Sequence, residues 1–122
     1  MSPVSTLSAP TAIGPYSQAI DAGALVFVSG QLPVDPATGA IPDGASVQAE
    51  QAFANVRAIL EAAGLGLDRV VKTTVFLADM GDFAAFNAVY AQYFTGKPAR
   101  SCVAAKSLPK NVLCEIELVA EL

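Results

Sequence analysis

Apolar residues recur every three or four positions in two stretches of the chain, and this period predicts two amphipathic helices. The first runs from Ser46 to Ala63, with Gly64 placed to end it. The second follows Asp79, which is suited to be an N-cap, and ends by Gly96. The predicted apolar faces are Ala49, Ala52, Phe53, Val56, Ile59, Leu60 and Ala63 in the first helix and Phe83, Phe86, Val89, Tyr90, Tyr93 and Phe94 in the second, with Gln48, Gln51, Asn55 and Glu61 off the first face.

Runs of β-branched, aromatic and alternating apolar residues predict strands. These runs are Tyr16 to Ile20, Ala24 to Ser29, Val70 to Ala78, Ala99 to Ala105 and Val112 to Ala120. Asp21-Ala22-Gly23 predicts a turn that makes the first two an antiparallel hairpin, with 25–28 as its buried strand. The run 70–78 has the continuous apolar character of a strand buried on both sides. We expect the last two strands to form a second antiparallel hairpin through residues 106–111.

The remaining segments are predicted to be irregular. Residues 1–15 are rich in Ser, Pro, Thr and Ala and predict an extended arm without a core of its own. Residues 32–43 predict a surface loop with a tight turn at Pro36 to Gly39. The order ββαβαββ indicates one α+β domain spanning 1–122, with a mixed sheet and both helices on one face.

The last predicted strand alternates between apolar and acidic positions. Cys114, Ile116, Leu118 and Ala120 are expected to face the helices, and Glu115, Glu117, Val119 and Glu121 to face away. The sheet would therefore have one uncovered face. The chain is 53% apolar and only 15% charged, so we expect that part of this surface forms a subunit interface.

Composition excludes several classes of function. The net charge is −4 with seven basic residues, which argues against nucleic-acid binding. The chain has no histidine, so the common His-dependent nucleophile systems are excluded. Cys102 and Cys114 lack metal-ligand spacing and are expected to be reduced, buried thiols. No apolar run reaches the roughly 18 residues that cross a bilayer, and the N-terminus has no basic leader, so we expect a soluble, cytoplasmic protein without a membrane partner.

Arg100 is the candidate for binding an anion, because a guanidinium near a strand start usually has an acidic partner. Arg100, Cys102 and Ala104 share one face of their strand. Strand pairing could bring Arg100 and Cys102 to the side of Glu115. Two interpretations stay open at this point: an internal Arg100–Glu115 ion pair, or a cation that binds a substrate.

Several motifs in order along nearly the whole chain resemble the RidA/YjgF family of enamine/imine deaminases. They are Ala12-Ile13-Gly14-Pro15-Tyr16-Ser17-Gln18-Ala19, Val28-Ser29-Gly30-Gln31-Leu32-Pro33, Val71-Lys72-Thr73-Thr74-Val75-Phe76-Leu77, Pro98-Ala99-Arg100-Ser101-Cys102-Val103, Leu108-Pro109-Lys110 and Glu115-Ile116-Glu117. The resemblance implies a chorismate-mutase-like homotrimer with a central barrel and sites in the clefts between subunits. It also implies hydrolysis of 2-iminobutanoate and 2-iminopropanoate to 2-oxoacids and ammonia, without a cofactor or metal.

The resemblance also implies roles for individual residues. Arg100 would bind the substrate carboxylate with help from the backbone N–H of Cys102, and Glu115 would position the attacking water. Tyr16, Ser29 and Gly30 would line the pocket, Asn87 would border it, and Glu117 would be supporting or structural. Burial would raise the pKa of Glu115 and the charge of Arg100 would lower it. Thr95-Gly96-Lys97 is shorter than the matching segment of family members, which affects the rim of the cleft.

Two alternatives remain. A non-catalytic module that senses small carboxylates such as 2-oxobutanoate would use the same clefts and the same arginine. An RNA-cleaving or translation-inhibiting activity, ascribed to some relatives, is disfavoured by the acidic charge and the lack of histidine.

Overall fold

The computed structural model describes residues 1–122, arranged as one mixed sheet and two α-helices. The strands are β1 (Ser2–Val4), β2 (Ala19–Asp21), β3 (Leu25–Gln31), β4 (Val70–Leu77), β5 (Ala99–Ala104) and β6 (Cys114–Glu121), and the helices are α1 (Ala45–Ala62) and α2 (Phe83–Tyr93). Three short 3₁₀ turns join these elements: Leu67–Arg69, Met80–Asp82 and Pro109–Asn111. The predicted α+β class is confirmed, and β1 is a strand that the sequence did not indicate.

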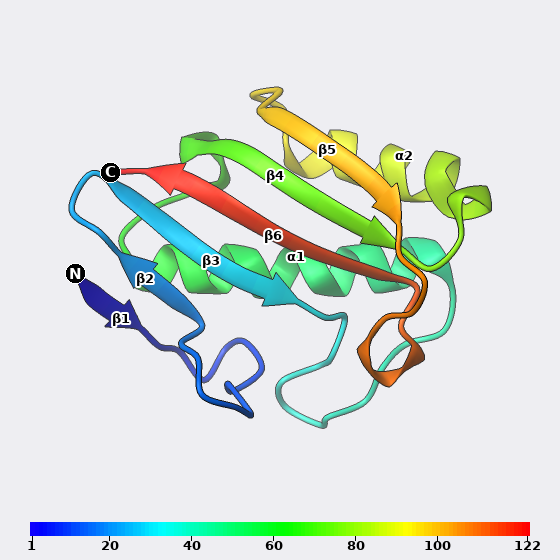
Figure 1. Cartoon of the computed structure of the whole chain (residues 1–122), viewed down its shortest axis with the longest axis horizontal. Coiled ribbons are helices and arrows are strands. Elements are labelled where there is room, and N and C mark those ends of the chain that lie inside the picture. Colours follow the sequence, from blue (N-terminus) through cyan, green and yellow to red (C-terminus); the bar gives the residue numbers. More distant parts are fainter.

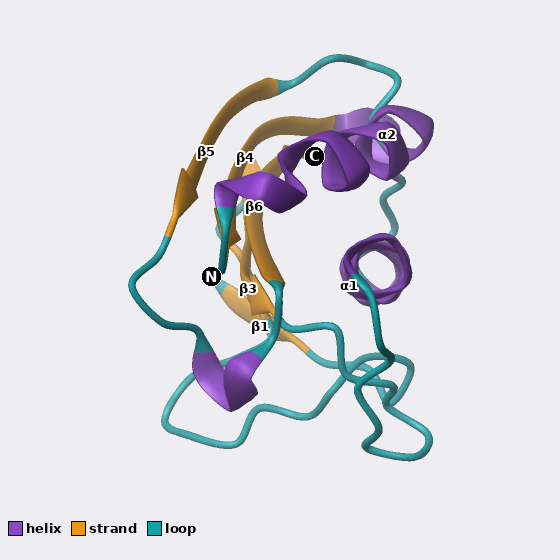
Figure 2. Ribbon diagram, turned by 90° about the vertical axis from the view of Figure 1, so that its right-hand side faces the viewer, coloured by secondary structure: helices purple, strands orange, loops and turns teal.

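The six strands lie in the order β1-β2-β3-β6-β4-β5. Figure 1 shows the sheet in front of the helices, and Figure 2, turned by 90°, shows both helices on the same side of it. Strands β4 and β5 pair in parallel across α2, while β6 pairs antiparallel with both β3 and β4. The prediction of a mixed sheet with both helices on one face is therefore confirmed.

The predicted hairpin of the last two strands is wrong. β5 pairs only with β4 and forms the edge of the sheet, and β6 lies two strands away, between β3 and β4. The central position buries one face of β6 completely: Ile116 and Ala120 have no exposed surface. Burial of that apolar face favours the centre of the sheet over the edge, and the connection after β5 is long enough to cross β4.

The two helices cover one face of the sheet and form the core with it. Phe53 of α1 lies at the centre, with its ring centroid 5.3 Å from those of Phe86 and Phe94. Gly64 has the positive φ of +79° expected at a helix end. Asp79 accepts a hydrogen bond from Gly81 N, so it caps the 3₁₀ turn before α2 and not α2 itself. Neither helix is long and apolar enough to cross a membrane.

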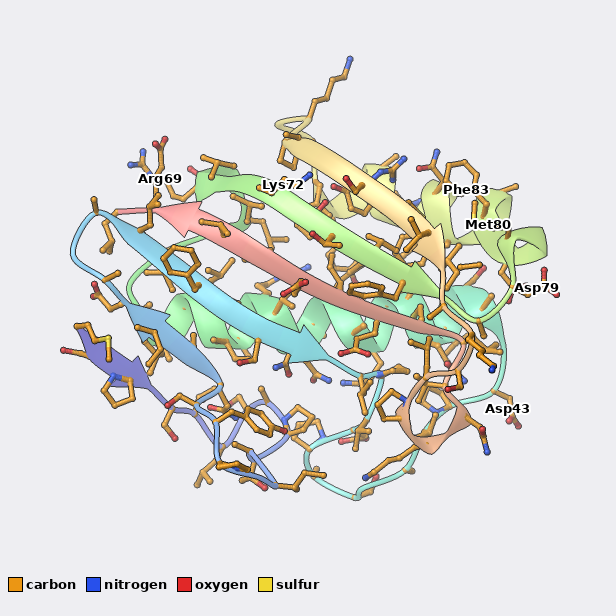
Figure 3. The ribbon with its side chains drawn as sticks, viewed as in Figure 1. Asp43, Arg69, Lys72, Asp79, Met80 and Phe83 are labelled. Atoms are coloured by element: carbon orange, nitrogen blue, oxygen red, sulfur yellow. The ribbon has the colours of Figure 1, made fainter.

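The other face of the sheet is open. The predicted burial of all of 25–28 is wrong, because Leu25 and Phe27 are 36% and 47% exposed on this face. Likewise β4 is buried on one face only, with Phe76 partly exposed on the other. Val103 of β5 is 48% exposed. Lys72 also lies on this face (Figure 3). Its Nζ donates to Ser101 Oγ at 3.2 Å.

Two side chains that were predicted to lie off the apolar face of α1 are in fact buried. Asn55 is 1% exposed and donates from Nδ2 to the carbonyls of Leu32 and Val34 at 3.0 and 2.9 Å. Gln48 donates to Pro42 O at 2.9 Å and accepts from Leu113 N at 2.7 Å. Both amides are therefore buried because they satisfy the backbone of irregular segments that have no strand partners.

A third amide, Gln18, binds the N-terminal arm to the domain. Its Nε2 donates to Pro10 O at 2.7 Å and its Oε1 accepts from Thr6 N at 2.7 Å. Ala9, inside the arm, is 1% exposed and belongs to the main core. The arm therefore has no core of its own, as expected, and it adds Ala9 to the core of the domain.

Candidate active site

Arg100 lies on the helix side of the sheet, at the edge strand β5. Its Nη1 donates to Asn87 Oδ1 at 2.8 Å. Its guanidinium carbon lies 4.6 Å from the centroid of the Tyr90 ring and 5.6 Å from that of Phe83. Asn87, predicted to border the site, is thus a direct hydrogen-bond partner of Arg100. A guanidinium has five N–H donors, so four remain for another acceptor.

A hollow of about 420 Å³ adjoins this arginine. Its lining comes from α2, the following turn and the start of β5: Asn87, Tyr90, Ala91, Phe94, Thr95, Lys97, Pro98 and Arg100. The short segment 95–97 contributes Thr95 and Lys97 to the rim. The hollow thus combines an arginine, a lysine and an apolar wall, a lining suited to a small molecule with a negative charge.

Cys102 follows Arg100 on the same face of β5 and is partly buried against the core. Burial raises the pKa of its thiol, and the charge of Arg100 opposes this rise only in part. A thiol with a raised pKa is a poor nucleophile at neutral pH. Because β5 is an edge strand, part of its backbone has no strand partner on the outer side. This position is compatible with the backbone role predicted for Cys102.

Glu115 lies on the open face of the sheet, where it contacts Gly30 of β3. A Cβ placed on Gly30 would collide with Glu115 Oε2 and lie 3.1 Å from Cδ. Gly30 is not among the glycines with positive φ, so its lack of a side chain serves this close approach and not an unusual backbone conformation. The sheet register between β3 and β6 shifts between Val28 and Gln31, beside this contact.

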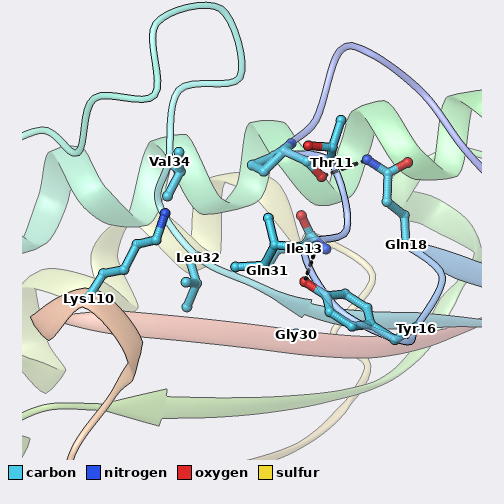
Figure 4. Close-up of a pocket in the computed structure, with 10 residues that line it drawn as sticks. Thr11, Ile13, Tyr16, Gln18, Gly30, Gln31, Leu32, Val34 and Lys110 are labelled. Atoms are coloured by element: carbon cyan, nitrogen blue, oxygen red, sulfur yellow. Dashed lines mark hydrogen bonds between the residues drawn. The ribbon is translucent and has the colours of Figure 1, made fainter.

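Tyr16 and Gly30 line a smaller hollow of about 70 Å³ beside β3 (Figure 4). Tyr16 is 50% exposed, and its hydroxyl accepts a 3.4 Å hydrogen bond from Ile13 N. Lys110 enters the same hollow from the connection before β6. Ser29 donates from Oγ to Ser17 O at 2.6 Å. Tyr16, Ser29, Gly30 and Glu115 are therefore neighbours around one end of β3.

The pKa of the Glu115 carboxyl is raised, first by its partial burial and then by the like charge of Glu117. Arg100 has no part in this shift within the chain. The sequence left open whether burial or the arginine would dominate, and in the single chain it is burial. A carboxylate whose pKa is raised is a stronger general base than an ordinary glutamate.

The structure does not join Arg100 to Glu115, and this overturns the expectation that strand pairing brings them to one side. Arg100 pairs in register with Thr73, whose partner on β6 is Leu118, so these three side chains face the helices. Glu115 pairs with Phe76, and both face away. Because β6 is not adjacent to β5, an internal Arg100–Glu115 ion pair is excluded within one chain. The predicted site residues form two separate halves.

Residue roles around the arginine were missed from the sequence. Phe83 and Tyr90 were assigned to the apolar face of the second helix, yet both also flank the guanidinium of Arg100. The available signal was their spacing to Asn87, because positions 83, 87 and 90 lie on one stripe of a helix. The partner of that stripe could not be identified without the position of β5.

Comparisons with known proteins agree with this fold and these motifs. The family model described as Endoribonuclease L-PSP matches residues 6–122. The chain belongs to this family, which is the RidA/YjgF family, and the recognition made from the motifs is confirmed. The 2-iminobutanoate/2-iminopropanoate deaminase of Salmonella typhimurium is 53% identical over 96% of this chain and 94% of the relative. The Escherichia coli K12 deaminase of the same name is 50% identical, with the same shares covered.

Solved structures of relatives match over almost the entire chain. Escherichia coli TdcF with bound serine has a TM-score of 0.97 and 47% identity, covering 100% of this chain and 99% of TdcF. The Escherichia coli YjgF gene product has a TM-score of 0.96 and 48% identity, covering 99% of this chain and 98% of the relative. The fold is therefore that of known RidA/YjgF structures.

Proposed function

We propose that this protein hydrolyses 2-imino acids such as 2-iminobutanoate and 2-iminopropanoate to 2-oxoacids and ammonia, in sites that two copies of the chain complete together. The observation that carries the proposal is the division of the site. Arg100 and Cys102 lie on the face of the sheet toward the helices, with Asn87 of α2 beside Arg100, whereas Glu115 lies on the open face against Gly30. Relatives at 50–53% identity are named for this activity.

The open face of the sheet supports association of copies. Leu25, Phe27 and Val103 are each more than a third exposed there, in a chain with few charged residues. Exposed apolar surface of this kind marks protein–protein contacts. We propose the homotrimer with a central barrel that a chorismate-mutase-like fold would form, in which the open faces meet. An Arg100 half of one copy then borders a Glu115 half of the next.

The chemistry needs orientation more than strong activation. The free donors of Arg100 would bind the carboxylate of the imino acid, with the Cys102 backbone N–H beside them, and fix the direction from which water reaches the C=N carbon. Glu115 would hold that water and accept its proton as oxygen bonds to carbon. That proton passes to the imine nitrogen and gives a carbinolamine. Glu115 would then carry the hydroxyl proton to the amine, so that the C–N bond breaks as the C=O bond forms and ammonia leaves. Such a positioned base contributes on the order of 10²- to 10⁴-fold.

No cofactor or metal has a part in this proposal, since the carboxylate and the guanidinium supply both functions. The cytoplasmic location stays a prediction.

A small-carboxylate binding module is the second candidate function. The relative TdcF, solved with bound serine, favours it, because serine carries a carboxylate but no imine. The two candidates share Arg100 and differ in whether Glu115 performs chemistry.

A coupled assay tests the proposal. Threonine dehydratase releases the enamine that becomes 2-iminobutanoate, and semicarbazide traps the imine before water hydrolyses it. We expect the wild type to suppress trapping and to speed the release of 2-oxobutanoate, while Arg100→Ala and Glu115→Gln leave trapping at the level of the dehydratase alone. Wild-type protein without any effect on trapping, or Arg100→Ala with full effect, contradicts the proposal. Binding of 2-oxobutanoate without turnover would favour the sensing module.

A further inference from the structure

Helix α2 surrounds the Arg100 guanidinium with three side chains from one stripe. Phe83, Asn87 and Tyr90 follow one another at intervals of four and three, so they lie on the same face of the helix. The guanidinium carbon lies 4.6 Å from the Tyr90 ring centroid, and Nη1 donates to Asn87 at 2.8 Å. The guanidinium is thus held over the face of the Tyr90 ring and by a hydrogen bond to the Asn87 amide.

Tyr90 is itself fixed from the sheet. Its hydroxyl and Thr73 Oγ1 are 2.8 Å apart in a buried hydrogen bond, and Thr73 has no exposed surface. Thr73 is also the residue of β4 that pairs directly with Arg100 on β5. Strand register therefore places the anchor of the ring beside the residue that the ring supports. Phe94 stacks on Tyr90 with 4.5 Å between ring centroids, which further limits movement of the ring.

This arrangement has a physical consequence for binding an anion. A guanidinium over the face of a ring is held by cation–π attraction, which does not use its N–H groups as hydrogen-bond donors to another polar atom. A bidentate pair with a carboxylate requires those in-plane donors at a fixed angle. Without this support, the long side chain of Arg100 would lose its rotamer freedom only when substrate binds, and that entropy cost would weaken binding.

We infer that Tyr90, anchored by Thr73, is a positioning residue that fixes the plane of the Arg100 guanidinium for the substrate carboxylate. The inference rests on the proposed function, in which Arg100 binds that carboxylate. Tyr90 does not take part in the proton transfers. Its effect is expected in carboxylate binding, with little change in the rate of the bound substrate.

The test compares five variants by KM and kcat for 2-iminobutanoate generated by threonine dehydratase, by calorimetric Kd for 2-oxobutanoate, and by thermal unfolding. Tyr90→Leu removes the ring, Tyr90→Phe and Thr73→Val remove either partner of the hydroxyl pair, and the double variant completes a cycle. Phe86→Leu is the control. Phe86 is a buried core residue of the same helix, and the cation–π contacts of Arg100 are with Phe83 and Tyr90 instead.

We expect Tyr90→Leu to raise KM and Kd about fivefold, the factor for losing a partly desolvated cation–π contact, with kcat changed far less. Tyr90→Phe and Thr73→Val should each raise Kd about twofold, and their combination should be no worse than either alone. Phe86→Leu should lower Tm without a change in Kd. If KM and Kd stay at wild-type values in Tyr90→Leu while Tm falls, the ring is only part of the core and the inference is wrong.

Failure of the two proposals can be told apart. A wild type without turnover refutes the proposed reaction, while the Kd series for 2-oxobutanoate still tests the support of Arg100. A wild type with turnover that Arg100→Ala abolishes, but with unchanged Kd in the hydroxyl variants, overturns the inference alone. Should Tyr90→Leu fail to fold, Phe83→Leu removes the second, less buried ring, and an unchanged Kd in that variant and in Tyr90→Phe overturns it equally.

Discussion

Replacing Gly30 by alanine tests how closely the Glu115 carboxylate must be placed. The new methyl group would collide with Glu115 Oε2 and lie 3.1 and 3.4 Å from Cδ and Cγ, so the carboxylate has to move. A displacement of about 1 Å at a reacting group can lower a rate about 10²-fold, and we expect a loss of that size in kcat for 2-iminobutanoate. The free energy of unfolding should change by less than about 1 kcal/mol, since the displaced atoms end a flexible side chain and Gly30 does not need a positive φ.

Gly96→Ala is the matched control for this substitution. Gly96 also lacks a positive φ, and nothing lies within 4 Å of a Cβ built on it. Both variants should be measured in the semicarbazide assay and by urea unfolding. We expect the control to keep wild-type kcat and stability. A Gly30→Ala protein with wild-type kcat would refute the assignment of Glu115 to the reaction. A large loss of stability would contradict the view that the missing side chain of Gly30 only makes room for the Glu115 carboxylate.

Three further predictions concern the titration of Glu115 and the buried amide of Asn55. Because burial and then Glu117 raise the pKa of Glu115, the acid limb of kcat/KM should lie above the ordinary pKa of a glutamate, and Glu117→Gln should move it to lower pH; an unmoved limb contradicts the pairing. Between the ordinary pKa of a glutamate and the raised pKa of Glu115, the folded protein still holds the Glu115 proton while the unfolded chain has lost it. The free energy of unfolding of the wild type should therefore fall as pH rises through this range, and Glu115→Gln should remove that fall. Asn55→Ala leaves the carbonyls of Leu32 and Val34 without a donor and should lower the free energy of unfolding by about 2–3 kcal/mol, whereas Gln51→Ala, which removes a donor to Asn55 alone, should lower it by less than about 1 kcal/mol. Equal losses in urea unfolding would contradict that difference.

The fold was predictable as far as local pattern decides it. The three-four period of the helices, the turn at Gly23 and the alternation along β6 follow from side-chain direction within one element, and each is confirmed. The place of β6 between β3 and β4 depends on which strands exchange hydrogen bonds across long connections, and alternation carries no information about the neighbour. That missing information produced the false hairpin.

Candidate site residues could be named from the sequence, but their arrangement in space could not. The motifs contain Arg100 and Glu115, the family resemblance added Asn87, and the structure brings Arg100 and Asn87 together. Opposite faces for Arg100 and Glu115 follow from the register of β5 against β4 and of β4 against β6, which no motif contains. Gln18, Gln48 and Asn55 were missed because an amide in a polar position looks the same whether it binds water or a carbonyl of a distant loop.

Complementation between two inactive variants tests the shared site most directly. Arg100→Ala and Glu115→Gln are each expected to be inactive, and the two proteins are unfolded together, refolded as a mixture and assayed with semicarbazide. If Arg100 of one copy works with Glu115 of the next, random mixing unites two intact halves at about one contact in four, and about a quarter of wild-type activity should return. Each variant refolded alone should stay inactive. A mixture without recovered activity, although the refolded proteins associate, would contradict a site built from two copies.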